Sequence, residues 1–261
     1  MSDVLVLCYH AVSERWPADL AVTPDQLDDQ LRYLVSRGYR GATVTAAILD
    51  PPYRRTLAVT FDDAYSSVLE LGLPILERFG LPGTVYVPTG FVGSERPLSW
   101  PGISEWAEGP HAAELTPLSW PELAGLAERG WEVGSHTRTH PRLTQVDDAV
   151  LADELAGSRD ECEGRLDRPC TSVAYPYGDV DARVVDAADD AGYLVGTGLT
   201  HRVRGARHLQ WPRLGVVRED SPDRFRRQVS PRVRRLVASP VGPVAERAYA
   251  VIRGRVRRAP S

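Results

Sequence analysis

Short apolar runs alternate with amphipathic segments along most of the chain. The apolar runs predict seven buried strands, at residues 4–9, 57–61, 83–87, 131–135, 172–175, 193–197 and around 214–217. Between them, apolar side chains recur at helical spacing and predict helices at residues 24–37, 65–79, 120–129, 147–166 and 181–191. Thr23 and Ser119 stand where N-caps are expected, and Gly38 and Gly80 stand where helices end.

This alternation of strand and helix is typical of a parallel sheet whose faces are covered by helices. The chain has 261 residues, close to what one closed α/β barrel needs. We therefore expect an α/β fold, a TIM-like barrel in a single domain over residues 1–230, with a basic C-terminal tail at 231–261.

Composition narrows the class of protein further. The chain is 43% hydrophobic and 25% charged, which excludes a disordered, collagen-like or coiled-coil architecture. Cys8, Cys162 and Cys170 contain no CxxC pair, so a reducing compartment is favoured over a disulfide framework. We see no signal peptide and no membrane-spanning stretch, and we expect a cytoplasmic location.

The tail differs in charge from the rest of the chain. Residues 230–261 carry eight arginines against the single acid Glu246, interleaved with apolar residues and broken by Pro240 and Pro243. Three interpretations stay open: a basic amphipathic helix on an anionic membrane surface, a docking segment for a glycosyltransferase, or a disordered solvated end. We expect no nucleic-acid partner, because no groove-reading or aromatic pattern accompanies the charge.

Polar residues follow three of the predicted strands directly. Asp62 and Asp63 come after the second strand, His136 and His140 after the fourth, and the segment 176–178 (Pro-Tyr-Gly) after the fifth. In a closed barrel of parallel strands, catalytic residues gather at the carboxyl ends of the strands. The pattern therefore predicts one active site built from these residues.

The spacing of His136 and His140 suggests a metal site. Residues four apart on a helix or helical turn share a face, so both imidazoles could bind one cation. A carboxylate from Asp62 or Asp63 would complete a set typical of catalytic zinc, and the other carboxylate would be free to accept a proton. The alternative is that the aspartates only cap a helix and that residues 176–178 only form a turn.

These motifs resemble those of the polysaccharide deacetylase family, the NodB-homology group also called carbohydrate esterase family 4. Residues 60–63 (TFDD) are similar to its first motif and residues 135–141 (SHTRTHP) to its second. Residues 174–178 (AYPYG) are similar to its third motif in the variant that lacks an arginine. The resemblance covers residues 4–217, with a core at about 55–217, and implies a distorted (β/α)7 barrel.

The resemblance implies a role for each matched residue. Asp63, His136 and His140 would bind a divalent metal, with Zn²⁺ the expected ion. Asp62 would be the general base for the attacking water, and the backbone N–H of Tyr177 would help to stabilise the oxyanion. The products would be acetate and a free amine.

The sequence departs from the family pattern at the third, fourth and fifth motifs. Ala174 replaces the usual arginine that steadies the base, and Arg213 is expected to substitute from another strand. The fourth motif has no clear match. The nearest counterpart of the fifth motif's histidine, the general acid, is His208, and the alternative is that His208 is an exposed loop residue.

Further residues are expected to line the substrate site. His10 ends the first strand in a stretch, LCYHAV, that resembles the start of many family members, and its alternative role is a structural histidine. Pro176, Tyr177 and Arg213 complete the expected substrate-binding set. We thus expect a metal-dependent hydrolase that removes N-acetyl groups from an amino sugar or glycan precursor. The alternatives are a hydrolase of another linear amide and a catalytically weak barrel that binds a glycan or a glycosyltransferase.

Overall fold

The computed structural model describes residues 2–199 and 207–237 of the chain. They form two compact units, which meet in the sequence between Asp220 and Ser221, and each is described here by itself. The first unit carries the strands at β1 Asp3–Tyr9, β2 Ala11–Val12, β3 Ala21–Val22, β4 Arg40–Gly41, β5 Arg55–Phe61, β6 Gly83–Val87, β7 Glu132–Ser135, β8 Ser172–Ala174, β9 Val195–Leu199 and β10 Trp211–Gly215. Its α-helices are α1 Pro24–Ser36, α2 Val44–Leu49, α3 Leu73–Arg78, α4 Trp120–Glu128, α5 Asp148–Ala152, α6 Ser158–Leu166 and α7 Ala182–Asp190.

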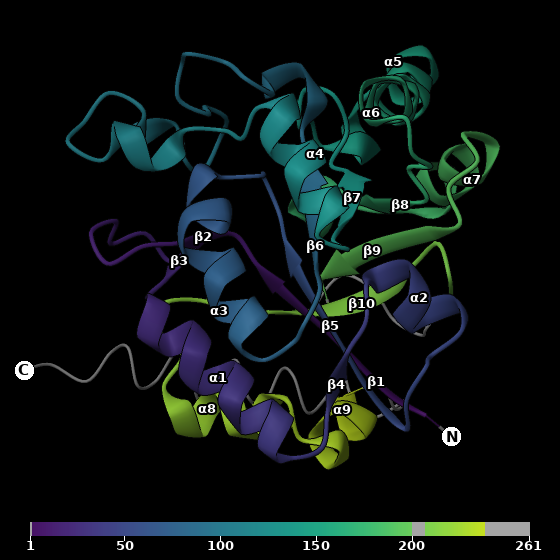
Figure 1. Ribbon diagram of the computed structural model, residues 1–261. Helices are drawn as coiled ribbons and strands as arrows, with labels where there is room; N and C mark the ends of the chain where they lie inside the picture. The colour runs from purple at the N-terminus through teal and green to yellow at the C-terminus, as the bar shows by residue number, and fades with distance from the viewer. Residues whose placement is uncertain (1, 200–206, 238–261) are drawn as a thin grey trace, which may run out of the picture. The chain divides into compact units, whose positions relative to one another are not determined.

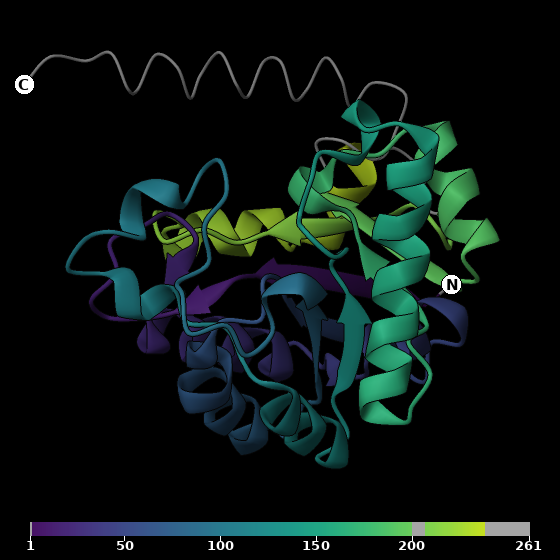
Figure 2. The same cartoon turned by 90° about the horizontal axis from the view of Figure 1, so that it is seen from above.

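A closed parallel barrel forms the centre of the first unit. Within the described residues, its seven strands follow the order β1, β10, β9, β8, β7, β6 and β5, and β5 pairs back to β1. The pairing of Tyr9 with Phe61 and of Cys8 with Gly215 aligns the carboxyl ends of β1, β5 and β10. Figures 1 and 2 show α1, α3, α4, α6 and α7 on the outside of these strands. The expected distorted (β/α)7 barrel is confirmed.

One end of the barrel is covered by α2. Val44, Ala47 and Ile48 of this helix pack in one buried cluster with residues of β1, β5 and β9. The Val44 N–H donates to the Thr84 hydroxyl near the start of β6. Since α2 covers the amino ends of the strands, the opposite end is left for the side chains that follow them.

The predicted helices occur, with shifts at their ends. Thr23 and Ser119 form capping boxes at α1 and α4, as their positions suggested. The predicted helix 147–166 is present and is wound as a π-helix over Asp153–Gly157, between α5 and α6. The predicted helix 65–79 is helical from Ser66 and continues through the π-helical turn Val68–Gly72 into α3.

The described part of the second unit is short. It contains α8 at Pro222–Gln228, capped by the Ser221 hydroxyl, and α9 at Pro231–Val237. The remaining tail, 238–261, on which most of the amphipathic pattern falls, lies outside the described residues. In the parts of the chain that the structure describes, no helix combines the length and the apolar character needed to cross a membrane.

Candidate metal centre and active site

Asp62 and Asp63 follow β5 at its carboxyl end, as expected. The Asp62 N–H donates to the Tyr9 carbonyl at 2.9 Å and so continues the pairing of β5 with β1. Asp63 and Ala64 then adopt left-handed backbone conformations, with φ of 70° and 53°. Non-glycine residues pay about 1–3 kcal/mol for such conformations, which concentrate at functional sites. Because the next helical segment begins at Ser66, neither aspartate is the residue that precedes it, and neither caps a helix.

The segment from His136 to His140 is a loop and not the helical turn expected from its spacing. Thr137 and His140 have φ of 67° and 60°, which turns the chain so that both imidazoles reach the same point. The Ser135 hydroxyl accepts from the Thr137 N–H at 3.0 Å, and the Thr137 hydroxyl accepts from the His140 N–H at 3.2 Å. Side-chain hydrogen bonds therefore stabilise this loop in place of the backbone hydrogen bonds that a helix would have supplied.

Glu154 fixes the same loop from the helix behind it. This buried carboxylate accepts the N–H groups of Arg138 and Thr139 at 2.7 and 2.9 Å, and also the Thr139 hydroxyl. Sequence reasoning missed Glu154, since it is one acid in a strongly acidic helix. Its buried position among neighbouring exposed acids is visible only in the structure.

Asp63, His136 and His140 converge as the metal-ligand prediction required. Asp63 Oδ1 lies 3.4 Å from His136 Nε2 and 3.5 Å from His140 Nε2. All three side chains are at most 5% exposed. His136 Nδ1 lies 2.7 Å from the Ala174 carbonyl, which can only accept a hydrogen bond, so Nδ1 carries the proton and Nε2 presents a lone pair.

The electrostatics of this group suit a bound cation. Burial lowers the pKa of both His136 and His140, so both rings are neutral at pH 7. Burial and the neighbouring Asp62 raise the pKa of Asp63 well above its ordinary value. Asp63 Oδ1 is buried and has no hydrogen-bond partner among the described residues. Electron-pair donors therefore face one another across a short gap, and two imidazoles with one carboxylate are a typical donor set for zinc.

Asp62 faces a different partner. Arg213, from β10, donates from its two terminal nitrogens to the two carboxylate oxygens, at 2.6 and 2.8 Å, and also to the Thr60 hydroxyl. Burial opposes ionisation of Asp62, but the Arg213 charge outweighs it and holds the pKa of Asp62 well below its usual range. The structure thus places Arg213 against Asp62, where the expected substitute for the third-motif arginine would lie.

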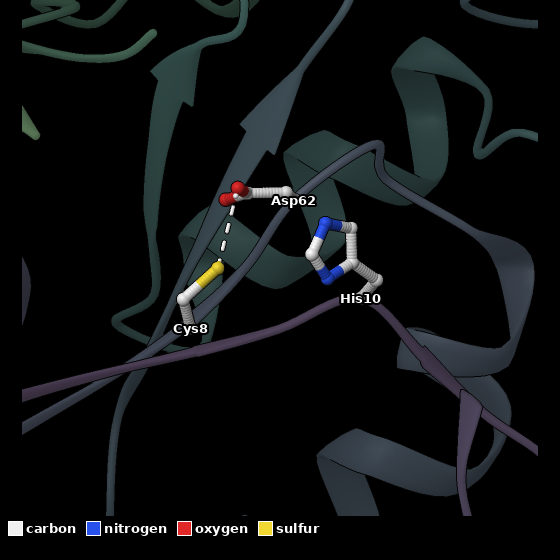
Figure 3. Close-up of side chains that lie close together, drawn as sticks. All are labelled: Cys8, His10 and Asp62. Carbon is white, nitrogen blue, oxygen red and sulfur yellow. Dashed lines mark hydrogen bonds between the residues drawn. The ribbon is translucent and has the colours of Figure 1, made fainter. Parts of the chain in front are cut away.

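His10 follows β1 directly and lies close to Asp62. A ring nitrogen of His10, Cys8 Sγ and a carboxylate oxygen of Asp62 lie within 4.8 Å of one another (Figure 3). The Cys8 thiol donates to Asp62 Oδ2 at 3.4 Å. His10 Nδ1 is buried without a described partner, and burial lowers the pKa of His10 to about 4. His10 is thus brought to the site.

Aromatic rings enclose the histidine His140. Trp100 stacks on it with ring centroids 4.2 Å apart, and Tyr177 meets it edge-on at 4.7 Å. Tyr177 has a φ of 59°, and the Arg142 guanidinium lies over its ring at 4.1 Å. Pro176 is buried beside it, at the start of the same turn. Tyr177 and Pro176 therefore lie next to the metal-ligand group, as expected.

His208 is not brought to the site. Its side chain is exposed in the turn before β10, and its carbonyl accepts from the Gly196 N–H near the start of β9. That position is at the amino ends of the strands, whereas Asp62, Asp63 and His136 follow carboxyl ends. Sequence proximity to β10 could not tell these two ends apart. The structure therefore gives no support to His208 as the general acid.

A family model described as polysaccharide deacetylase matches residues 50–196, which is more than half of the chain. The chain belongs to the polysaccharide deacetylase family. The match contains both aspartates and both histidines of the site. It ends before Arg213, so the partner of Asp62 lies outside the matched segment.

Similar proteins agree with this assignment. A poly-β-1,6-N-acetyl-D-glucosamine N-deacetylase of Staphylococcus aureus is 22% identical over 74% of this chain. A putative polysaccharide deacetylase of Bacillus subtilis, YxkH, is 22% identical over 73% of this chain, and the chain spans 62% of its length and 66% of the length of the S. aureus relative. The Streptococcus pyogenes deacetylase PplD, solved in complex with acetate, matches with a TM-score of 0.71 and 23% identity over 87% of this chain and 98% of its own. IcaB from Ammonifex degensii matches with a TM-score of 0.67 and 22% identity over 88% and 96%. These structures share the fold.

Proposed function

We propose that this deacetylase-family barrel is a metal-dependent hydrolase that removes the acetyl group from N-acetylated amino sugars of a glycan. The observation that carries the proposal is the convergence of Asp63, His136 and His140 around an unsatisfied buried carboxylate oxygen, with a second carboxylate, Asp62, beside it. Membership of the polysaccharide deacetylase family and the name of the S. aureus relative support an N-acetylglucosamine polymer as the first substrate to test.

Asp63, His136 and His140 would hold the metal, for which zinc suits the donor set. When bound, such an ion polarises a carbonyl oxygen and lowers the pKa of water. His136 is already in the tautomer that binds, because its Nδ1–H donates to the Ala174 carbonyl and leaves Nε2 with a lone pair. The left-handed backbone at Thr137 and His140 orients the ligands before the ion arrives.

Asp62 would remove a proton from the water that attacks the acetamide carbon. Arg213 keeps Asp62 ionised and fixes both of its oxygens. A carboxylate held this strongly in its ionised form retains a proton only briefly, so the proton passes on. The backbone N–H of Tyr177 would donate to the carbonyl oxygen as negative charge develops there.

The leaving amine needs a proton, and we propose that His10 supplies it. Its ring is neutral at pH 7 and neighbours Asp62, so it can take up the proton that Asp62 received and transfer it to the leaving nitrogen. The amide C–N bond breaks as the N–H bond forms, and the products are acetate and a free amine. We assign this role to His10 in place of His208.

The test is acetate release from N-acetylglucosamine oligomers and from poly-β-1,6-N-acetylglucosamine. Chelator-treated protein should be inactive and should recover with zinc or cobalt. Asp62→Asn should lower kcat by about 10²–10⁴-fold, the range for loss of a positioned general base, while the metal content stays at one ion per chain. Full activity in Asp62→Asn would refute the base assignment. Glycan binding without any acetate release would favour a binding module.

We also propose a cytoplasmic location and a binding role for the C-terminal tail. We infer that the arginine-rich residues 231–261 contact either an anionic membrane surface or a partner enzyme, because their basic and apolar residues are interleaved. Deleting 231–261 should leave hydrolysis of soluble oligomers intact and abolish sedimentation with phosphatidylglycerol vesicles. Unchanged sedimentation would exclude membrane binding by the tail.

A further inference from the structure

A second group of metal-binding donors lies beside the first. Cys8 and His10 come from the end of β1 and Asp62 follows the adjacent strand β5, and parallel pairing of these strands brings the three together. Their donor atoms lie within 4.8 Å of one another (Figure 3). Zinc holds its donors at about 2.0–2.3 Å, so two donors of one ion stand roughly 3.5 Å apart, and small side-chain shifts suffice to reach that spacing.

The chemistry of this group selects a particular kind of cation. A thiolate sulfur, an imidazole nitrogen and a carboxylate oxygen together suit zinc or cobalt(II), whereas magnesium and calcium prefer oxygen donors. A ring nitrogen of His10 is one of the three donor atoms, and His10 Nδ1 is buried with no hydrogen-bond partner among residues 2–199 and 207–237. The Asp63, His136 and His140 group contains no sulfur, which makes the two sites chemically distinguishable.

Three features lower the affinity of the Cys8, His10 and Asp62 group for a cation below that of the Asp63, His136 and His140 group. The Arg213 guanidinium, bound to both oxygens of Asp62, repels an incoming cation. An ion held by Asp63, the next residue along the chain, adds further repulsion. The buried Cys8 thiol must also lose its proton to bind. Occupation therefore requires metal in excess of one equivalent.

We propose that Cys8, His10 and Asp62 form a second, low-affinity site for zinc or a similar thiophilic divalent cation, and that its occupation switches the enzyme off. On binding, the S–H bond of Cys8 breaks, its proton goes to solvent and a metal–sulfur bond forms, with no change of oxidation state. The inhibitory part rests on the proposed function, because the cation would engage Asp62 and His10, the two groups assigned to proton transfer. The existence of the site does not depend on activity.

Cobalt spectroscopy tests the site directly. Metal-free protein is titrated with Co²⁺, and the near-ultraviolet band that arises from thiolate-to-cobalt charge transfer is followed. The first equivalent should give no such band, and further equivalents should produce it with release of one proton per ion. Cys8→Ser, which keeps a hydroxyl donor toward Asp62, should lack the band. Cys162→Ser, a buried cysteine of α6, is the matched control and should keep it.

Zinc inhibition tests the consequence. Acetate release by the wild type should be maximal near one equivalent of zinc and fall with excess. Loss of an outer-shell partner typically costs about 10–100-fold in metal affinity, so loss of a ligand in Cys8→Ser should shift inhibition to at least ~10-fold higher zinc.

Absence of the cobalt band in the wild type would overturn the site, as would its persistence in Cys8→Ser. If Cys8→Ser does not fold, His10→Gln replaces it in the cobalt titration. The Co²⁺ concentration at which the band is half-developed should then rise at least ~10-fold. An intact band with no acetate release under any condition would instead refute the proposed hydrolase activity and leave the second site standing.

Discussion

Arg213 and Asp62 form a buried, two-point ion pair across the barrel, with nitrogen–oxygen distances of 2.6 and 2.8 Å. Arg213 is 1% exposed, and its charge serves a residue 151 positions earlier in the chain. The family-typical arginine of the third motif is Ala174 here. The backbone carbonyl of Ala174 orients His136, but its side chain carries no charge. The positive charge beside Asp62 comes from Arg213 of β10 instead.

Replacing Arg213 by Gln should change both stability and pH dependence. Removing one partner of a buried pair costs about 3–5 kcal/mol, because the other charge is left uncompensated. The folded-state pKa of Asp62 lies below its ordinary value of 3.8, so this stabilisation is present above pH 3.8 and is lost as pH falls through the folded value. The two proteins should therefore converge in stability in strong acid.

The activity of Arg213→Gln provides a second readout. Without the guanidinium, the pKa of Asp62 rises, so the acid limb of the kcat/KM profile should move to higher pH. Arg129→Gln, which breaks an exposed pair with Glu77, is the control and should change stability by less than about 1 kcal/mol. If the acid limb of the kcat/KM profile has the same midpoint in Arg213→Gln as in the wild type, the group that titrates in that limb is not Asp62.

Zinc should stabilise the protein through Asp63. At a free concentration 100 times Kd, binding to the folded state alone contributes about 2.7 kcal/mol. Asp63→Asn should lose most of this rise in melting temperature. Its metal-free form should be no less stable than the wild type, because burial and the neighbouring Asp62 raise the pKa of Asp63 and so disfavour its charge when no cation is present. If calorimetry shows the same zinc-induced rise in melting temperature for Asp63→Asn and the wild type, Asp63 is excluded as a ligand.

Glu154 should act as a positioning residue for the two histidines. Glu154→Gln replaces a carboxylate that accepts from two backbone N–H groups and one hydroxyl, so the loop 136–140 should loosen. We expect a loss of about 10–100-fold in zinc affinity, measured by competition with a chelating dye. Asp153→Asn, an exposed neighbour paired with Arg138, should leave affinity within about twofold, in keeping with the small energies of surface pairs.

His10 and His208 should differ sharply in their contribution to turnover. His10→Gln should lower kcat by about 10²–10⁴-fold with the metal content unchanged, the range for loss of a general acid. His208→Gln should keep wild-type kcat, because that side chain is exposed at the amino ends of the strands. A large loss in His208→Gln would place the acid on His208 and contradict the geometry.

Residue patterns in the sequence were enough to predict the barrel fold and the end of the barrel at which the candidate site lies. Buried strand runs and capped helices predict the barrel because each is a local consequence of side-chain burial and backbone hydrogen bonding. Their position directly after strands predicted that the aspartates and histidines would lie at the carboxyl end of the barrel, and the family resemblance of the TFDD and SHTRTHP motifs singled out Asp63, His136 and His140 as the expected ligands. Even so, the histidines converge through a strained loop and not through the helical turn that their spacing suggested.

Only the tertiary structure decided the partners of Asp62. Arg213, Cys8 and His10 reach it because β5 closes the barrel by pairing with β1 while β10 pairs with β1 from the other side. Such contacts depend on strand order and register over long sequence separations, which local patterns do not encode. For the same reason His208, close to Arg213 in sequence, lies at the opposite end of the strands, and Glu154 could be recognised only by its burial.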